Sequence, residues 1–256
     1  MRACDASHPS DGLFKILSIM AKPRARAKSA PPVRLTLGID EAGRGPAVGP
    51  MVIAAVVLDS RSAASLTRRG LCDSKTYGAG DDAHATRSAL DVEIRKRASF
   101  VALIEVEHTE IDERVLRHEL NVLERELATR LIDQAPTVDR IIADGKRMFA
   151  ALGQRYPHFE SHDRAEEKHA SVAAASVVAK VVRDNRFARI RARYERELGP
   201  ITGGGYANAA TRRWLRAYAE RYGRLPDEAR LTWPHPYVED LIGSVRPPGP
   251  QAELFA

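Results

Sequence analysis

The sequence predicts an α/β fold, because four short apolar runs alternate with longer segments in which apolar residues recur at helical spacing. The four runs, which we expect to be strands, cover residues 35–40, 51–59, 99–108 and 139–145. The first three are almost continuously apolar, which is typical of strands buried on both faces. The helical segments cover residues 109–134 and about 170–198, and a last helix begins near Thr211.

The first helical segment places Leu120, Leu123, Leu127 and Leu131 in one apolar stripe. Thr109 stands at its start, where a hydroxyl can accept a hydrogen bond from a free backbone N–H. We therefore expect one helix over residues 109–134, with Thr109 as its N-cap. The segment 170–198 predicts a longer helix, and a glycine-rich loop separates it from the last one. We expect these closing helices to form a cap appended to the sheet.

The chain has 256 residues, enough to bury a substantial core, and a net charge of +6. This mild basic excess favours a polyanionic partner such as nucleic acid. Its two cysteines, Cys4 and Cys72, exclude a disulfide framework and indicate a reducing compartment. No apolar run has the length of a membrane span. We expect a cytoplasmic monomer without membrane contact.

Composition changes near both ends of the chain. Residues 1–33 mix Ser, Pro, Ala and basic residues without periodicity, and predict a disordered basic tail. Residues 243–256 are rich in Pro and Gly and predict a second flexible tail. Between the tails we expect a main α/β domain over residues 34–198 and a C-terminal helical cap over residues 199–242.

Two of the strand candidates end in an aspartate that a glycine follows closely. Asp40 closes the first run, with Glu41 after it, and Asp144 closes the fourth. If these strands are neighbours, both aspartates lie at one edge of the sheet, where glycine permits the backbone turns. Consecutive strand residues point to opposite faces, so we expect Glu41 to lie beyond the last regular strand position and to reach the same point. The alternative is that these are turn residues exposed to water.

A cluster of carboxylates is the ligand set that hard divalent cations prefer. Acids that lie so close repel one another unless cations neutralise them. Two Mg²⁺ or Mn²⁺ ions, about 4 Å apart, can activate a water molecule and stabilise the leaving oxygen at one phosphate. The cluster therefore indicates hydrolysis of a phosphodiester.

Five sequence blocks resemble, in this order, the signature blocks of ribonuclease HII: GIDEAGRGPAVGP, LCDSK, IIADGK, AAASVVAKVVRD and GGGYANAATRRWL. The resemblance implies a ribonuclease H-like mixed sheet flanked by helices, with a C-terminal helical extension, so that residues 34–198 are the catalytic domain. It implies endonucleolytic cleavage of RNA in RNA/DNA hybrids and cleavage 5′ to single ribonucleotides embedded in duplex DNA, leaving 5′-phosphate and 3′-hydroxyl ends. Type III enzymes lack the glycine-arginine-glycine triplet, which favours type II.

The resemblance also implies roles for the acids. Asp40, Glu41 and Asp144 match the family's metal-binding acids, which use Mg²⁺ or Mn²⁺. The fourth acid of the family is usually an aspartate ten residues before the serine of the AAS block, and here that position is Glu166. A longer side chain can bind metal or act through water, and the neighbouring Asp163 and Glu167 are alternatives for the same role.

The family's substrate-binding residues carry over in the same way. Gly43, Arg44 and Gly45 resemble the loop that reads the ribose 2′-hydroxyl through backbone groups, and Tyr206 matches the tyrosine that stacks on the sugar. The sequence YANA around this tyrosine departs from the family's commoner YP.D. Lys75, Ser176 and Lys180 stand where the family places polar residues near the substrate. The alternative is that both lysines are solvated and that the serine permits close helix packing.

Two further features favour contacts with other molecules. Arg186, Arg189, Arg193 and Arg196 fall at spacings of three and four and share one helix face, which can contact phosphates or can be a solvated face paired with Glu195 and Glu197. The terminal Gln251 to Phe255 resembles the short peptides by which bacterial replication and repair proteins bind the sliding clamp.

Two other classes of function fit part of this pattern. The protein can be a non-catalytic module that binds hybrids, if the altered fourth acid abolishes hydrolysis. It can also be another nuclease of the same fold, such as a junction resolvase, which does not need a ribose-reading loop. A duplex that carries one ribonucleotide distinguishes these readings.

Overall fold

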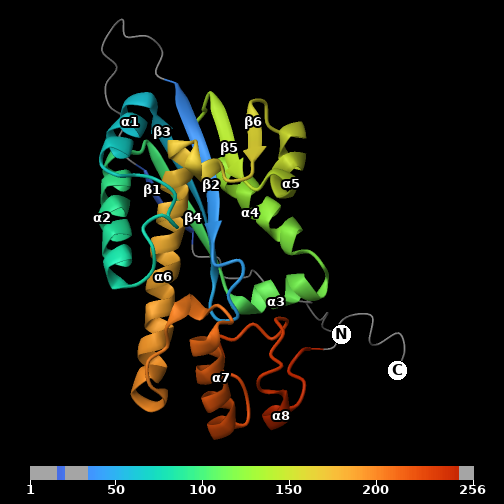
Figure 1. Ribbon diagram of the computed structural model, residues 1–256. Helices are drawn as coiled ribbons and strands as arrows, with labels where there is room; N and C mark the ends of the chain where they lie inside the picture. Colours follow the sequence, from blue (N-terminus) through green and yellow to red (C-terminus); the bar gives the residue numbers. More distant parts are fainter. Residues whose placement is uncertain (1–15, 21–33, 248–256) are drawn as a thin grey trace, which may run out of the picture.

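The computed structural model describes residues 16–20 and 34–247. Its centre is one mixed sheet of six strands in the order β1-β4-β3-β2-β5-β6 (Figure 1). Neighbours pair antiparallel from β1 to β2 and parallel from β2 to β6. The strands are β1 (Ile16–Met20), β2 (Leu35–Ala42), β3 (Met51–Asp59), β4 (Phe100–Val106), β5 (Arg140–Asp144) and β6 (Phe159–His162).

Helices cover both faces of this sheet, and the last two lie beyond one end of it (Figure 1). The α-helices are α1 (Ser60–Arg68), α2 (Asp81–Arg97), α3 (His108–Leu116), α4 (Leu120–Gln134), α5 (Lys146–Phe149), α6 (Ala170–Leu198), α7 (Ala209–Tyr222) and α8 (Glu239–Ile242). Short 3-10 turns, η1 (Ala150–Gln154), η2 (Ala165–Glu167) and η3 (Gly203–Gly205), connect some of them. The predicted α/β class, with a mixed sheet flanked by helices and a C-terminal helical extension, is confirmed.

Each face of the sheet has its own hydrophobic core, because side chains alternate along a strand. On one face, Leu37 and Ile39 of β2 pack with the apolar stripe of α4. On the other face, Val52 and Val56 of β3 pack with α2 and with the first half of α6. Every residue of β3 except the last is buried. The central strands are therefore covered on both faces, as the near-continuous apolar runs predicted.

The close packing of α6 on β2 depends on Gly38. A Cβ atom on Gly38 would lie 2.1 Å from the backbone carbon of Ser171, which is shorter than real carbon contacts allow. The helix can therefore lie directly on the strand only because this residue has no side chain. This contact fixes the height of α6 along β2, and with it the position of Ser176 relative to Asp40.

The second half of α6 leaves the sheet and packs with α7. Its Phe187 and Ile190 are buried together with Trp214, Leu215 and Tyr218 of α7. One helix thus contributes to both the sheet core and the core of the C-terminal helical region.

Two local predictions about helices are wrong. The segment 109–134 is not one helix: α3 and α4 are separated at residues 117–119, where His118 has a left-handed backbone with φ of 59°. Thr109 lies inside α3, whose N-cap is Glu107. The last long helix begins at Ala209, close to the expected start near Thr211, and the Asn208 side chain caps it by accepting a hydrogen bond from the Thr211 backbone N–H at 3.0 Å.

The ends of the chain are described only in part. Disorder was expected throughout residues 1–33, but Ile16–Met20 form β1, which pairs antiparallel with β4. The remainder of that tail and residues 248–256, including the terminal peptide Gln251 to Phe255, lie outside the described residues. Among the helices that are described, none is long and apolar enough to cross a membrane.

Candidate active site

Asp40 and Asp144 end up side by side because β2 and β5 are neighbouring parallel strands. The register pairs Ile39 with Ala143, so the two aspartates are the next residues on adjacent strands. Asp40 is 6% exposed, and Asp144 is partly buried. The adjacency of these strands, on which the predicted convergence of the two acids depended, is therefore confirmed.

Asp40 lies against the α6 side of the sheet. Burial raises the pKa of Asp40 well above its usual range, and repulsion from Glu41 and Asp144 raises it further, while a hydrogen bond with Ser176 lowers it. The Ser176 hydroxyl also lies 2.8 Å from the hydroxyl of Ser74. Ser176 is thus buried and in contact with an acid of the site.

Glu41 occupies a different position from the one predicted. β2 continues to Ala42 and pairs Glu41 with Ile53, so Glu41 is a regular strand residue and does not lie beyond the pleat. Its side chain therefore lies on the opposite face from Asp40, where Glu124 and Asp144 surround it. Burial, followed by repulsion from these two carboxylates, raises the pKa of Glu41 to about 7, although Arg44 opposes the shift. Asp144 is thus electrostatically coupled to both acids of β2.

The fourth acidic position is filled by Glu166, on the turn η2. The Ala165 backbone N–H donates to Asp144 Oδ1 at 2.7 Å, which holds this turn against the end of β5. Glu166 is 3% exposed, and its Oε1 accepts a hydrogen bond from Lys75 Nζ at 3.2 Å. Burial and then repulsion from Glu166 raise the pKa of Asp144, although the Ala165 N–H opposes this shift.

The two alternatives to Glu166 have other partners. Asp163 Oδ1 accepts a hydrogen bond from the Lys146 backbone N–H at 2.9 Å. Glu167 forms an ion pair with Arg164. Of the three acids considered for this position, Glu166 is the one whose charge acts on Asp144.

Four carboxylates of distant sequence origin therefore lie around the end of β2 and β5. Glu41 Oε2 and Glu166 Oε2 are both buried and have no hydrogen-bond partner. Clustered hard oxygen ligands with an excess of negative charge fit a divalent cation. Among the described residues, no three His, Cys, Asp or Glu side chains are already closed around one point, so the acids are neighbours rather than a finished coordination shell.

The glycine-arginine-glycine loop begins directly after β2 and turns the chain toward β3. Gly43 has φ of 87°, a conformation that side chains disfavour. The Arg44 side chain donates to Glu124 Oε1 at 2.9 Å and to Asn121 Oδ1 at 2.7 Å, so its guanidinium is directed toward α4. Gly45 is exposed on the outer side of the loop.

Tyr206 lies against this loop. A Cβ atom on Gly45 would lie 3.4 Å from the ring of Tyr206, and the Ala47 backbone N–H donates to the Gly205 carbonyl at 2.8 Å. Tyr206 is 49% exposed, which is unusual for a large aromatic residue. The ring and the loop therefore form one continuous surface next to the acids.

The remaining predicted polar residues divide into two groups. Lys75 and Ser176 contact acids of the site, as described above. Lys180 is paired instead with Asp184, one turn further along α6, and burial lowers its pKa. Lys180 therefore does not contact the acidic cluster.

Sequence reasoning missed three residues at this site. Glu124 is fully buried on the apolar stripe of α4, and a charged residue within such a stripe was a signal that could have identified it. Burial raises the pKa of Glu124, although Arg44 opposes the shift. Arg183 and Arg230 are both buried against the glycine loop, and nothing in their local sequence indicates that position.

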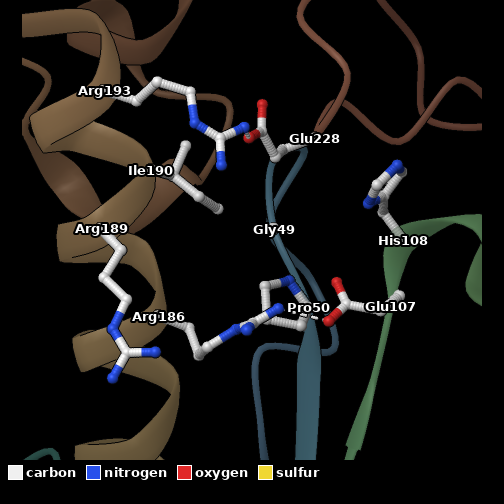
Figure 2. Close-up of a pocket in the computed structure, with 9 residues that line it drawn as sticks. All are labelled: Gly49, Pro50, Glu107, His108, Arg186, Arg189, Ile190, Arg193 and Glu228. Atoms are coloured by element: carbon white, nitrogen blue, oxygen red, sulfur yellow. Dashed lines mark hydrogen bonds and ion pairs between the residues drawn. The ribbon is translucent and has the colours of Figure 1, made fainter. Parts of the chain in front are cut away.

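Three arginines of the α6 row, Arg186, Arg189 and Arg193, line a separate cavity of about 350 Å³, bordered by Gly49 and Pro50. Figure 2 shows Arg193 directed toward Glu228 and Arg186 toward Glu107. Arg186 also pairs with Glu105 at 3.2 Å. Two members of the row, Arg186 and Arg193, are therefore paired with carboxylates. Their partners are not the expected Glu195 and Glu197, because the tertiary structure brings β4 and the C-terminal segment alongside the helix.

Comparison with known proteins agrees with this geometry. The sequence profile of the family Ribonuclease HII matches residues 37–235. A ribonuclease HII of Pyrococcus horikoshii is 33% identical over 206 residues, which is 77% of this chain and 88% of that protein. The crystal structure of ribonuclease H2 from Pyrococcus horikoshii superimposes with a TM-score of 0.68 at 27% identity, covering 84% of this chain and all (100%) of that one.

A second solved structure, the complex of PCNA and ribonuclease HII from Archaeoglobus fulgidus, matches with a TM-score of 0.65 at 26% identity. It covers 78% of this chain and 95% of that chain. The profile extends over most of the described sheet and helices, including the acidic edge and the glycine loop. The chain therefore belongs to the ribonuclease HII family and is a nuclease of the ribonuclease H class.

Proposed function

We propose that this protein hydrolyses the RNA strand of RNA/DNA hybrids and cuts 5′ to single ribonucleotides embedded in duplex DNA, leaving 5′-phosphate and 3′-hydroxyl ends. One observation carries the proposal: the acids at the ends of β2 and β5 lie directly beside the surface formed by the glycine loop and Tyr206. Hydrolysis of a phosphodiester needs the acids, and selection of ribose needs the loop.

In this proposal Asp40, Glu41 and Asp144 hold Mg²⁺ or Mn²⁺, and Glu166 supplements them. A bound pair of divalent ions supplies an activated water and stabilises the leaving oxygen. Lys75 holds Glu166 in place through its hydrogen bond, and Ser176 orients the Asp40 carboxylate. The unpartnered buried oxygens of Glu41 and Glu166 support this assignment, because such atoms are costly unless a ligand satisfies them.

The glycine loop distinguishes ribose from deoxyribose in this proposal. A hydroxyl is both a donor and an acceptor, so backbone groups that approach it closely can detect it without reading a base. Gly43 and Gly45 allow that approach because they have no side chains, and Arg44 is held aside by Glu124. Tyr206 supplies an exposed ring on which the sugar at the junction stacks.

The deciding experiment uses a DNA duplex with one ribonucleotide, tested with Mg²⁺, with Mn²⁺ and with a chelator, beside an all-DNA duplex of the same sequence. We expect a cut 5′ to the ribonucleotide that requires the metal, and no cut in the all-DNA duplex. Binding without cutting indicates a non-catalytic hybrid-binding module. Equal cutting of both duplexes indicates a nuclease of the resolvase type.

We also propose that Gln251 to Phe255 bind a sliding clamp in the cytoplasm, where the protein acts as a monomer. The structural relative solved as a complex with PCNA supports a clamp as partner. Deletion of residues 250–256 is expected to abolish retention by the clamp in a pull-down while cleavage of the single-ribonucleotide duplex stays unchanged. Retention by the shortened chain contradicts this part of the proposal.

A further inference from the structure

The guanidinium of Arg230 is the most fully engaged buried charge of the described residues. It is 0% exposed, and all its hydrogen bonds go to backbone carbonyls of the glycine loop. Nε donates to the Gly49 carbonyl at 3.0 Å, Nη1 to the Arg44 carbonyl at 2.7 Å, and Nη2 to the Gly43 carbonyl at 2.5 Å. No carboxylate forms an ion pair with it within the described part of the chain. A charge buried on carbonyls alone is expensive to maintain, which indicates a purpose for these contacts.

The segment that carries Arg230 is itself held rigidly from behind. Asp112 of α3 accepts hydrogen bonds from the backbone N–H groups of Leu231 at 2.8 Å and Thr232 at 3.0 Å. His235, which is 1% exposed, hydrogen-bonds to the Arg230 carbonyl at 2.8 Å. The Trp233 indole then donates to the Gly45 carbonyl at 3.1 Å. Residues 230–233 therefore hold three consecutive carbonyls of the loop, those of residues 43, 44 and 45.

Holding these carbonyls also determines where the loop's N–H groups point. In a trans peptide the carbonyl of one residue and the N–H of the next point in opposite directions. The described chain has no cis peptide, so Arg230 turns the N–H groups of Arg44 and Gly45 away from itself. No protein group accepts a hydrogen bond from either of these N–H groups within the described residues. The carbonyls of Gly45 and Gly49 precede Pro46 and Pro50, which have no N–H to orient.

We propose that Arg230 is a positioning residue that determines ribose specificity, by holding the carbonyls of Gly43 and Arg44 so that the N–H groups of Arg44 and Gly45 are presented to the sugar. The inference rests on the proposed function, because it concerns the same loop. Arg183 has a complementary place: it is 1% exposed, lies against Gly43 from the α6 side and donates to the Val48 carbonyl at 3.2 Å. The loop is thus fixed between two buried guanidinium groups.

The test compares Arg230→Met and Arg230→Lys with two controls. Leu215→Ala removes a fully buried side chain from the core of the C-terminal helical region and leaves the loop residues unchanged. It is the control for a general loss of stability. Arg216→Met removes an arginine that binds Asp240 and the Tyr237 carbonyl, away from the loop. The melting temperature of each variant is measured first, so that all later measurements are made at a temperature at which every variant is folded.

Two measurements on these variants are needed. The first is the amide NMR signal of Arg44 and Gly45 in the full chain without nucleic acid. The second is the ratio of affinities for the single-ribonucleotide duplex and the all-DNA duplex, measured in chelator. For Arg230→Met we expect both amide signals to shift or broaden and the ratio to fall about tenfold, because a fixed donor pair is lost. We expect Arg230→Lys to restore part of the ratio, and both controls to keep it.

The outcomes separate the inference from the function. Unchanged amide signals in folded Arg230→Met overturn the positioning role, whether or not the wild-type protein cuts. A disturbed loop with an unchanged ratio overturns the specificity role, as does an equal fall of the ratio in Leu215→Ala. If the wild-type protein itself does not discriminate between the two duplexes, the ribose-reading function and the specificity role fail, while the amide signals still decide whether Arg230 orders the loop.

Discussion

Two charged regions of the molecule are assembled from distant segments: the acidic edge of β2 and β5, and the arginine cavity of α6. They differ in whether opposite charges are paired or like charges are gathered. In the cavity, Arg186 and Arg193 are paired with carboxylates from β4 and the C-terminal segment (Figure 2). At the acidic edge, like charges are gathered and repel one another. Paired charges can stabilise a surface without any ligand, whereas gathered like charges are retained at a cost in stability. The acidic cluster, where Lys75 and Arg44 compensate only part of the charge, is therefore the better indicator of a binding site.

The largest effect is expected from Asp40→Asn. This change keeps the size of the side chain but removes one charge from the acidic edge, and we expect cleavage of the single-ribonucleotide duplex to fall about a thousandfold. The affinity for the hybrid is expected to change less than about threefold, because the loop and Tyr206 are untouched. Steady-state kinetics and a binding assay in chelator check this. Turnover close to the wild-type rate excludes Asp40 from the metal-binding set.

A smaller effect is expected at Glu166, which can either bind a metal ion directly or act through a water molecule. We expect Glu166→Gln to lower the rate about 10- to 100-fold, as outer ligands of metal sites do. Glu166→Asp, which restores the family's usual residue, is expected to stay within about tenfold of the wild type. Glu167→Gln is the matched control, because its carboxylate pairs with Arg164 at the surface. Equal rates in all three variants mean that Glu166 has no part in the reaction.

The acidic edge also predicts how stability depends on pH. The pKa of Glu41 is raised from 4.5 to about 7, so between these pH values the folded chain binds more protons than the unfolded chain. The free energy of unfolding of the metal-free protein therefore falls as pH rises from about 4.5 to about 7, by up to about 1.4 kcal/mol per pH unit.

Chemical denaturation at several pH values in chelator measures this slope, and Glu41→Gln is expected to flatten it. Glu93→Gln is the control, because ion pairing with Lys96 and its neighbours lowers the pKa of Glu93 and moves it out of this window. Added Mg²⁺ is expected to reduce the slope as well, since a cation stabilises the ionised form. A free energy of unfolding that increases with pH in chelator contradicts the raised pKa of Glu41.

The smallest effects are expected in the arginine cavity. Arg186→Gln is expected to leave the affinity for the hybrid within about twofold of the wild-type value, because Arg186 already forms ion pairs with Glu105 and Glu107. Glu228→Gln frees Arg193 and is expected to increase the affinity for the hybrid. The slope of log affinity against log salt concentration is expected to become steeper by about one unit. Binding titrations at several salt concentrations decide this. A large loss in Arg186→Gln means that the row contacts phosphates despite its ion pairs.

Most of the fold was predictable from local patterns. The apolar runs predicted β2 to β5, and the helical spacing predicted α6 over its full length. The break between α3 and α4 was not predictable, because the apolar stripe continues across it and only the backbone of His118 leaves the helical conformation. β1 was also missed, because five residues in a basic, Pro-rich tail become a strand only through pairing with β4.

At the site, the sequence by itself identified the candidate residues: the acids at the strand ends, the glycine loop and the tyrosine are all contained in short motifs. The tertiary structure alone decided how they are arranged. It placed Glu41 on the opposite face of β2 from Asp40, surrounded Glu41 with Glu124, and brought Arg230 to the carbonyl of Arg44 across 186 residues of sequence. The physical reason is that periodicity and turn chemistry act over a few residues, whereas burial, repulsion and hydrogen bonding act between whatever the fold brings together.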